Sequence, residues 1–362
     1  MKQTTKSLLT LATVILFFTV LYFANKYLDP YKLIILTLCG INVVLGLSMN
    51  LINGFTGQFS LGHAGFMAVG AYTAALLTMP PEVKEMNWFA VPMWPPLHDL
   101  CWPFFLAVIM GGLVAAFFGF LIGIPVLRLR GDYLAIATLG FAEVIRVVII
   151  NVKPLTNGAL GLKAIPVVTD VFWAWGAAVL TIFLMIRLIN SSYGLALKSI
   201  NSDEIAAEAM GVNLFYHKML SFVLSSFLAG VGGALLGGLL GTVDPTMFTF
   251  LMTFNILLIV VLGGLGSITG SVIGAVFVTI LMEWLRIVES PVDLGFVQIP
   301  GIPGMRMVIF SFLLVLVIIF YQQGLLGRRE LTWEGIFNLL RQVQERFKKR
   351  NKDKSVPSSE VG

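Results

Sequence analysis

The 362-residue sequence has little charge and few of the side chains from which most enzymatic sites are built. It has three histidines and two cysteines, and 12% of its residues are charged, against about 25% in an average soluble domain. It contains no Gly-rich Walker phosphate loop, no nucleophile–base motif and no group of side chains with metal-ligand spacing. We therefore expect no catalytic residue, no metal site and no ATP hydrolysis by this chain itself.

The two cysteines, Cys39 and Cys101, are too few for a disulfide framework. Both fall in or beside apolar segments, so we expect two buried thiols, although a bridge between them remains an open alternative. The formal net charge is only +5, and the basic residues gather in the C-terminal segment and a few loops. That distribution gives no support to nucleic-acid binding.

Apolar side chains are what the sequence has in excess. Hydrophobic residues make up 57% of the chain, which is more than one water-soluble core of this size would bury, so a lipid bilayer is the expected solvent. A membrane-spanning helix needs about 20 mostly apolar residues. Such runs lie at 8–24, 33–52, 59–79, 103–127, 133–152, 171–189, 219–243, 248–264, 269–288 and 305–323. We predict an all-α polytopic integral membrane protein with about ten transmembrane helices.

The stretch from 245 to 282 contains no charged residue and is too long for a single crossing. Glycines cluster at its middle, at 263–270, and permit a tight turn. We therefore expect two helices joined by a hairpin.

The placement of lysine and arginine predicts the orientation of the spans. With the N-terminus in the cytoplasm, the heavier basic set faces the cytoplasm, namely Lys2, Lys6, Arg128, Arg130, Arg187, Lys198, Lys218 and the C-terminal segment. The lighter set then lies outside, namely Lys26, Lys32, Lys84, Lys153 and Lys163. We predict that both termini are cytoplasmic.

The loop 190–218 is then cytoplasmic and contains the signals of a short helix. Ser202 can act as its cap, and the acidic Asp203, Glu204 and Glu208 precede or follow small helix formers at Ala206 and Ala207. Gly211 can end the helix. A rigid helix with small side chains could dock into a groove on a partner, although an ordinary solvated connection has the same pattern.

The same loop carries a family resemblance. Glu204-x-Ala206-Ala207 with Gly211 resembles the EAA–Gly signature of the permeases of ABC importers. Three further segments, 57–64, 127–136 and 261–267, resemble the LivM family of branched-chain amino acid permeases in order and spacing. Residues 322–327 resemble the family's ending, with Gln322 or Gln323 where Pro is more usual. The resemblance covers about residues 33–327.

The resemblance implies the ABC importer permease fold and alternating access, with branched-chain or related amino acids as substrates. It implies a homologous, LivH-like partner permease, two LivG/LivF-like ABC ATPases and an external substrate-binding protein, in the plasma (inner) membrane. ATP and Mg²⁺ would bind to the ATPases, and no cofactor to this chain. The coupling residues would be Asp203, Glu204, Ala206, Ala207, Glu208 and Gly211.

A polar segment follows the second apolar run. Asn53, Gln58, Ser60 and His63 lie at or near a membrane boundary, with glycines between them. Polar groups at membrane depth face a cavity or a partner, and glycines permit a break in a helix whose backbone could meet a substrate. We predict that this segment lines the translocation pathway; for His63 alone, a hydrogen bond to a neighbouring span is an equal alternative.

Glu143 and Arg146 lie three residues apart within the run 133–152, on one helix face. We expect them to form an intramembrane ion pair that is structural and does not bind substrate. Residues 1–327 would form the transmembrane domain, and 328–362 a cytoplasmic tail with a basic amphipathic helix and a disordered end.

Two other functions agree with the sequence. One is a urea or short-amide permease of the same superfamily, which differs only in its solute. The other is an ion-coupled secondary transporter without ATPases, which would need carboxylates within the spans. Glu143 is the best candidate for such a group, and Arg146 lies beside it.

Overall fold

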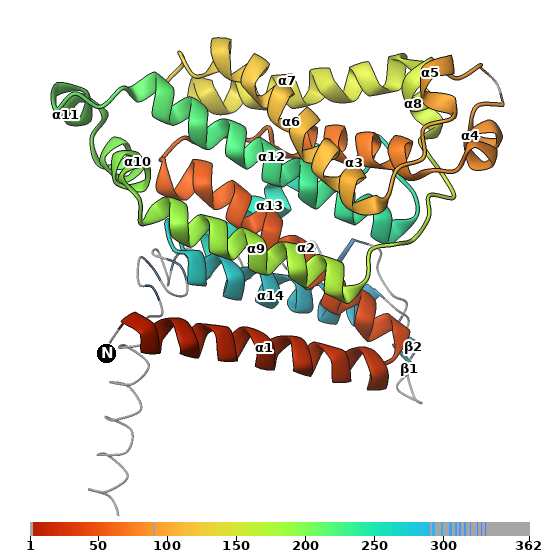
Figure 1. The fold of residues 1–362 in the computed structure, drawn as a ribbon, viewed down its shortest axis with the longest axis horizontal. Helices are drawn as coiled ribbons and strands as arrows, with labels where there is room; N and C mark the ends of the chain where they lie inside the picture. Colours follow the sequence, from red (N-terminus) through yellow and green to blue (C-terminus); the bar gives the residue numbers. More distant parts are fainter. Residues whose placement is uncertain are drawn as a thin grey trace, which may run out of the picture.

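The computed structural model describes residues 3–89 and 91–289, together with scattered positions between 292 and 330. Long helices lie side by side in this part of the chain (Figure 1). Six of its helical segments are long and apolar enough to cross a membrane. They are α1 (Gln3–Tyr27), α2 (Pro30–Asn50) with its π-helical continuation η1 (Leu51–Phe55), α6 (Phe104–Val126), α7 (Asp132–Asn151), α9 (Val171–Ile189) and α12 (Leu214–Leu240).

Three other predicted spans form shorter helices, namely α3 (His63–Thr78), α13 (Phe250–Gly263) and α14 (Ile268–Trp284). The 16 residues of α3 rise about 24 Å, less than the hydrocarbon thickness of about 30 Å, because residues 56–62 are not helical. Helices α13 and α14 are separated by the predicted glycine turn. The run 305–323 falls largely outside the described residues, as does the predicted tail helix. The described residues thus carry six helices of spanning length, fewer than the predicted ten.

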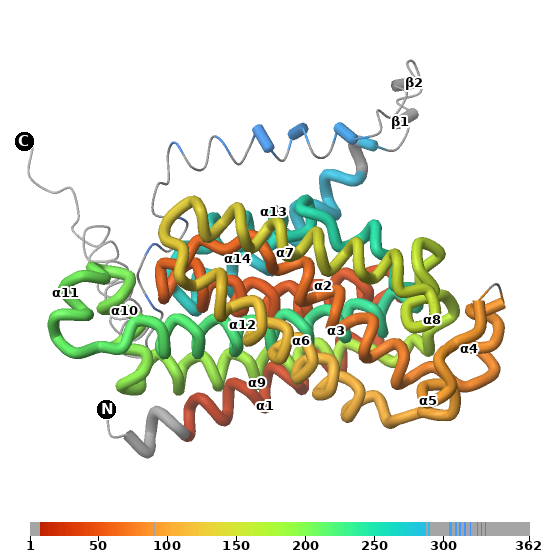
Figure 2. The backbone as a smooth tube through the Cα atoms, turned by 90° about the horizontal axis from the view of Figure 1, so that it is seen from above, coloured from red at the N-terminus to blue at the C-terminus, as the bar shows by residue number. Residues whose placement is uncertain are grey.

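Shorter elements lie at the two ends of the bundle. Helices α10 (Ser192–Ser202) and α11 (Glu204–Ala209) project from the end at which α1 begins (Figure 1). The opposite end carries α4 (Pro81–Asn87), α5 (Pro95–His98), α8 (Lys153–Thr156) and the 3₁₀ turn η2 (Gly158–Leu160) (Figure 2). After the 3₁₀ turn η3 (Leu285–Glu289), the strands β1 (Val292–Asp293) and β2 (Gln298–Ile299) pair antiparallel.

Helix α12 lies at the centre of the packing, against α6, α3 and α2, while α9 and α14 pack on α2. Glycines permit a close crossing of α3, α6 and α12, where Gly70, Gly111 and Gly230 meet. A Cβ atom at Gly70 would lie 2.2 Å from the carbonyl oxygen of Gly230, so no larger residue fits. Such contacts of small residues are how helices associate in lipid, where the hydrophobic effect does not drive them together.

The buried polar side chains of the central helices bond across the bundle, as the absence of water at membrane depth requires. Ser225 in α12 donates to the carbonyl of Ser48 in α2 at 2.7 Å, and Ser48 donates to the carbonyl of Ser225 at the same distance. The prediction of two buried thiols is wrong for one of them. Cys39 is buried, whereas Cys101 is exposed, because it lies in the loop before α6 instead of within the helix.

Candidate coupling and translocation elements

The predicted coupling loop folds as two short helices, α10 and α11, where the sequence indicated one. The cap of α11 is Asp203 and not the predicted Ser202: the Asp203 carboxylate accepts hydrogen bonds from the backbone N–H groups of Ile205 (2.9 Å) and Ala206 (3.0 Å). The Ser202 hydroxyl instead donates to the carbonyl of Lys198 within α10. Asp203 has extended backbone angles, which place its side chain over the open helix end, while Ser202 is still helical.

Gly211 follows the end of α11 and has a φ of +86°, in the left-handed region that favours glycine. Its N–H donates to the carbonyl of Glu208 at 2.9 Å, and the N–H of Val212 donates to that of Ala207 at 3.0 Å. These two hydrogen bonds satisfy backbone carbonyl groups at the C-terminal end of α11 that have no partner within the helix. A Cβ atom added at Gly211 would meet nothing within 4 Å, so the constraint here is the backbone angle and not space.

Glu204 joins α11 to the base of a central helix. Lys218, the fifth residue of α12, donates to the Glu204 carboxylate at 2.6 Å, and the Arg130 Nε lies 3.9 Å from that carboxylate. The Lys218 side chain is 8% exposed and the Glu204 side chain is 34% exposed, so the pair is buried on the lysine side and open to solvent on the glutamate side. Sequence reasoning assigned Glu204 to the helix dipole and to the family signature; it missed the contact with Lys218, which lies 14 residues away.

The two faces of α11 differ. Ala207 is buried against the chain itself, whereas Ile205 and Met210 are 74% and 85% exposed. Two large apolar side chains thus face outward from α11. The small alanines that the sequence suggested as the docking face therefore do not all face outward, and the two exposed apolar residues went unnoticed because nothing in the sequence fixed the face of so short a helix.

A cleft of about 610 Å³ lies beside α11. Its basic lining comes from Arg128, Arg130 and Lys218, and Glu208 and Gly211 line its other side. Three basic side chains and one acidic side chain thus line the cleft next to the end of α11.

The predicted break after the second apolar run is present in the structure. Helix α2 widens into η1, and residues 56–62 form no helix before α3 begins at His63. Within the break, the backbone N–H of Ser60 donates to the Asn53 side chain at 3.2 Å. The N–H groups of Leu61 and Ala64 donate to hydroxyls from two other helices, those of Thr138 (3.0 Å) and Thr253 (3.0 Å).

Gln58, Ser60 and His63 lie inside the subunit and not on a lipid-facing surface; each is 3% exposed or less. Neither polar atom of the Gln58 amide has a hydrogen-bond partner among the described residues, and nor does the Nε2 of His63. Asn53 is partly buried. Buried polar groups without a hydrogen-bond partner are rare in folded proteins, so Gln58 and His63 stand out among the buried side chains of the break.

Glu143 and Arg146 pair within α7. The Arg146 Nε donates to the Glu143 carboxylate at 2.7 Å, and the two side chains are 40% and 29% exposed on the outside of the bundle. The pair lies on the rim of the bundle.

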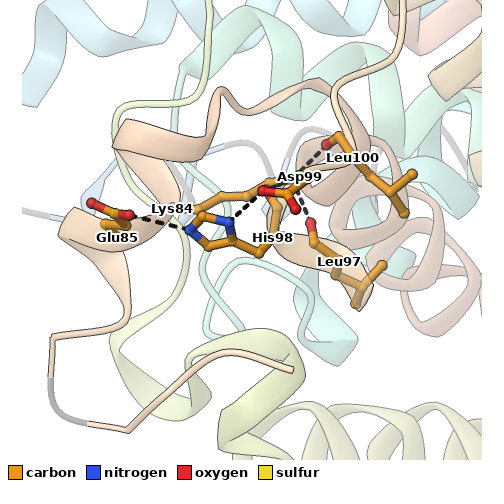
Figure 3. A network of polar contacts seen from close by, with 6 residues as sticks. All are labelled: Lys84, Glu85, Leu97, His98, Asp99 and Leu100. Carbon is orange, nitrogen blue, oxygen red and sulfur yellow. Dashed lines mark hydrogen bonds and ion pairs between the residues drawn. The ribbon is translucent and has the colours of Figure 1, made fainter. Parts of the chain in front are cut away.

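A polar network that the sequence did not indicate lies at the opposite end of the bundle (Figure 3). The buried Lys84 in α4 donates to the backbone carbonyls of Leu97 (2.8 Å) and Leu100 (2.5 Å). His98 lies between two carboxylates, with Nδ1 2.7 Å from Asp99 and Nε2 3.3 Å from Glu85. Burial lowers the pKa of Lys84. The hydrogen bond to Asp99 raises the pKa of His98, and Glu85 adds to this.

No group of three or more His, Cys, Asp or Glu side chains able to hold a metal ion occurs among the residues that the structure describes.

Comparisons with known proteins give a consistent picture. Residues 31–319 match the family model for the permease component of branched-chain amino acid transport systems. A high-affinity branched-chain amino acid permease protein, LivM of Salmonella typhimurium, is 34% identical over 286 residues, which are 70% of this chain and 63% of that relative. A nucleoside ABC transporter permease protein, NupC of Lactococcus lactis, is 24% identical over 49% of this chain and 58% of its own length.

A third relative is the probable branched-chain amino acid permease protein LivH of Methanocaldococcus jannaschii, with 32% identity over 28% of this chain and 31% of its own. The chain thus spans less than two thirds of the length of each of these three relatives. No solved structure matches it.

Proposed function

The chain belongs to the family of permease components of branched-chain amino acid transport systems, and we propose that it is the membrane subunit of an ATP-driven importer of branched-chain or related amino acids. The observation that supports this most is the family match over residues 31–319, which includes the broken segment, the ion pair in α7 and the projecting α11. The ATPases are separate subunits that bind ATP and Mg²⁺, and this chain contributes the path.

In this proposal α11 is the element that meets an ATPase. The capped ends of α11 make it rigid, and Ile205 and Met210 present an apolar surface for a groove on the partner. Glu204 and Ala207 face the chain and hold α11 in place, through Lys218 and by packing. A displacement of α11 would therefore be passed to the base of α12.

The whole assembly follows the family. About ten spans place both termini and the loop 190–218 in the cytoplasm, with the α4–α5 end outside in the inner membrane. A LivH-like permease completes the pore, and an external binding protein delivers the substrate. The segment with Asn53, Gln58, Ser60 and His63 lines the path, and the Glu143–Arg146 pair is structural.

One observation favours a second class of substrate. The relative NupC carries the name of a nucleoside transporter, so members of this wider group differ in their solutes. Nucleosides are therefore a second candidate, along with urea or short amides.

Reconstitution of the tagged chain with co-expressed ATPases and partner permease tests the proposal. We expect the ATPases to co-purify and the proteoliposomes to take up labelled leucine, isoleucine or valine only when ATP and the binding protein are present. Uptake of uridine or urea in place of leucine would change the substrate class. Uptake driven by an ion gradient without ATPases would show a secondary transporter and overturn the proposal.

A further inference from the structure

Asn201 connects the coupling loop to the broken end of the second span. It lies in the last turn of α10, two residues before the cap of α11, and its Nδ2 donates to the carbonyl of Gly54 in η1 at 2.7 Å. Part of the side chain remains exposed on the outer surface of the loop. The same residue thus reaches both the surface beside α11 and the backbone of the break.

Gly57 makes the second half of this contact. Its φ of +72° lies in the left-handed region, and a Cβ atom there would lie 2.4 Å from the Asn201 side-chain oxygen. Glycine at this position is therefore required both by the backbone angle and by the closeness of Asn201. The Asn201 amide thus contacts the break on both sides of Phe55 and Thr56.

The other side of η1 is tied to the turn between α13 and α14. Asn50, one residue before η1, accepts a hydrogen bond from the N–H of Gly266 at 2.9 Å and donates to the carbonyl of Ser267, also at 2.9 Å. The π-helical turn η1 is thus hydrogen-bonded on one side to the coupling loop and on the other to the turn between α13 and α14. Single-turn π-helices within α-helices occur often at functional sites, because their widened hydrogen bonding is easily rearranged.

The interior behind this turn is closed and yet polar. Gln58 and His63 are buried there without partners for the Gln58 amide atoms and the His63 Nε2. Opening of the segment would let water bond to these groups, which offsets part of the cost of breaking its present hydrogen bonds.

We propose that segment 51–62 is the moving inner end of the translocation path, and that Asn201 is the positioning residue through which the coupling loop moves it. The inference rests on the proposed function and names the residue that passes the movement of the coupling loop to this segment. In the described state Asn201 holds the segment closed. When an ATPase displaces α11, Asn201 moves with α10 and the carbonyl of Gly54 follows or is released, which admits water to Gln58 and His63.

The test follows the accessibility of the segment in the assembled transporter. Ser60→Cys is placed in a background with Cys39→Ala and Cys101→Ser, and thiol labelling is measured from the cytoplasmic face with and without ATP and vanadate. We expect a severalfold change in labelling between the two nucleotide states. Asn201→Ala should remove most of this change and lower the uptake per ATP hydrolysed severalfold, while the ATPases still co-purify.

Asn190→Ala is the matched control, since Asn190 is an exposed asparagine in the same loop, and it should retain the full change. If Asn201→Ala fails to reach the membrane, Gly57→Ala disturbs the same contact from the other side and should give the same loss. Nucleotide-dependent labelling that persists in the Asn201→Ala or Gly57→Ala variant would overturn the role of Asn201.

Two outcomes distinguish a failure of the proposed function from a failure of the moving segment. Failure of the unaltered chain to bind ATPases would overturn the proposed function. ATPase binding and uptake without any nucleotide-dependent labelling of Ser60→Cys would overturn only the moving segment.

Discussion

Single charged residues in this chain are placed where their surroundings compensate for lost water. Lys84 is surrounded by backbone carbonyls, Lys218 meets Glu204, and Arg146 meets Glu143. Burying a charged side chain without such partners would destabilise the fold by several kcal/mol, and moving it into lipid would cost a similar amount. Removal of one partner from any of these contacts should therefore lower the stability of the folded chain.

Replacement of Glu143 by Leu should leave Arg146 uncompensated on the rim of α7. The cost should approach the roughly 2.5–3.5 kcal/mol of an unpaired arginine at mid-membrane, and the level of assembled permease should fall. The double variant Glu143→Leu/Arg146→Leu should recover part of the loss, since no charge is left unpaired. Both are measured as permease level and thermal stability in detergent. A double variant that assembles fully and yet transports nothing would assign the pair to the pathway.

His98 should make the α4–α5 end more stable in acid. Its pKa is raised in the folded chain, so the stabilisation is complete below the unfolded pKa of about 6.5 and is lost as the pH rises through the folded value. Amide exchange in residues 81–98, corrected for intrinsic rates, should be slower at pH 5.5 than at pH 8. His98→Gln should remove this difference. An equal pH dependence in the variant would assign the effect to other groups.

At the scale of elements, α11 shows how a six-residue helix acquires two distinct faces. Alanine at 207 lets the helix lie close on the chain, and Ile205 and Met210 remain outside. Helix propensity alone would not stabilise α11, because a helix of this length is marginal in isolation. The Asp203 cap, the left-handed Gly211 and the Glu204–Lys218 pair hold it.

Met210→Asp should weaken ATPase binding, because docking would then bury a carboxylate without a partner. A loss of about 1.4 kcal/mol or more would lower the affinity about tenfold or more. Uptake and substrate-stimulated ATP hydrolysis should fall together while permease levels stay normal. Met86→Asp, at a similarly exposed methionine on the opposite end, should leave ATPase binding unchanged. Normal coupling in Met210→Asp would exclude this face of α11 from the interface.

Gly211→Arg should show a similar loss with a different physical origin. The added chain meets open space, but the left-handed backbone angle costs a residue with a Cβ atom roughly 1–2 kcal/mol and displaces the end of α11. Helix insertion should be unaffected. Transport and ATP hydrolysis in the reconstituted complex measure the effect, and wild-type coupling would show that α11 does not transmit motion.

The sequence predicts the elements that depend on local pattern and misses those that depend on three-dimensional neighbours. Nine of the apolar runs correspond to helices in the described residues, and the break at 56–62 and the turn at 264–267 fall where glycines indicated them. The choice of Asp203 over Ser202 as cap was beyond the pattern, since both residue types cap well. The Glu204–Lys218 contact, the carbonyl ring around Lys84 and the reach of Asn201 all join distant segments, for which one sequence gives no signal.

At the scale of the whole molecule, the two ends of the bundle are chemically different. One carries α11 with the basic cleft, and the other carries the α4–α5 network and the exposed Cys101. Ser202→Cys in the background without native cysteines should be protected from an impermeant thiol reagent in intact cells, and Met86→Cys should react. Asn87 would be a poor reporter, because it is buried and bonded to the backbone of Lys163. Labelling of Ser202→Cys from outside would reverse the orientation.

The crossing of Gly70, Gly111 and Gly230 has a mechanical consequence. Three backbones touch there without an intervening layer of side chains, so nothing at this point can repack by a change of rotamer. We therefore expect helices α3, α6 and α12 to move together, because a shift at this crossing would bring backbone atoms into collision. A push received at Lys218 would therefore arrive with little attenuation near the far end of α12, where Val243 bonds to Leu162.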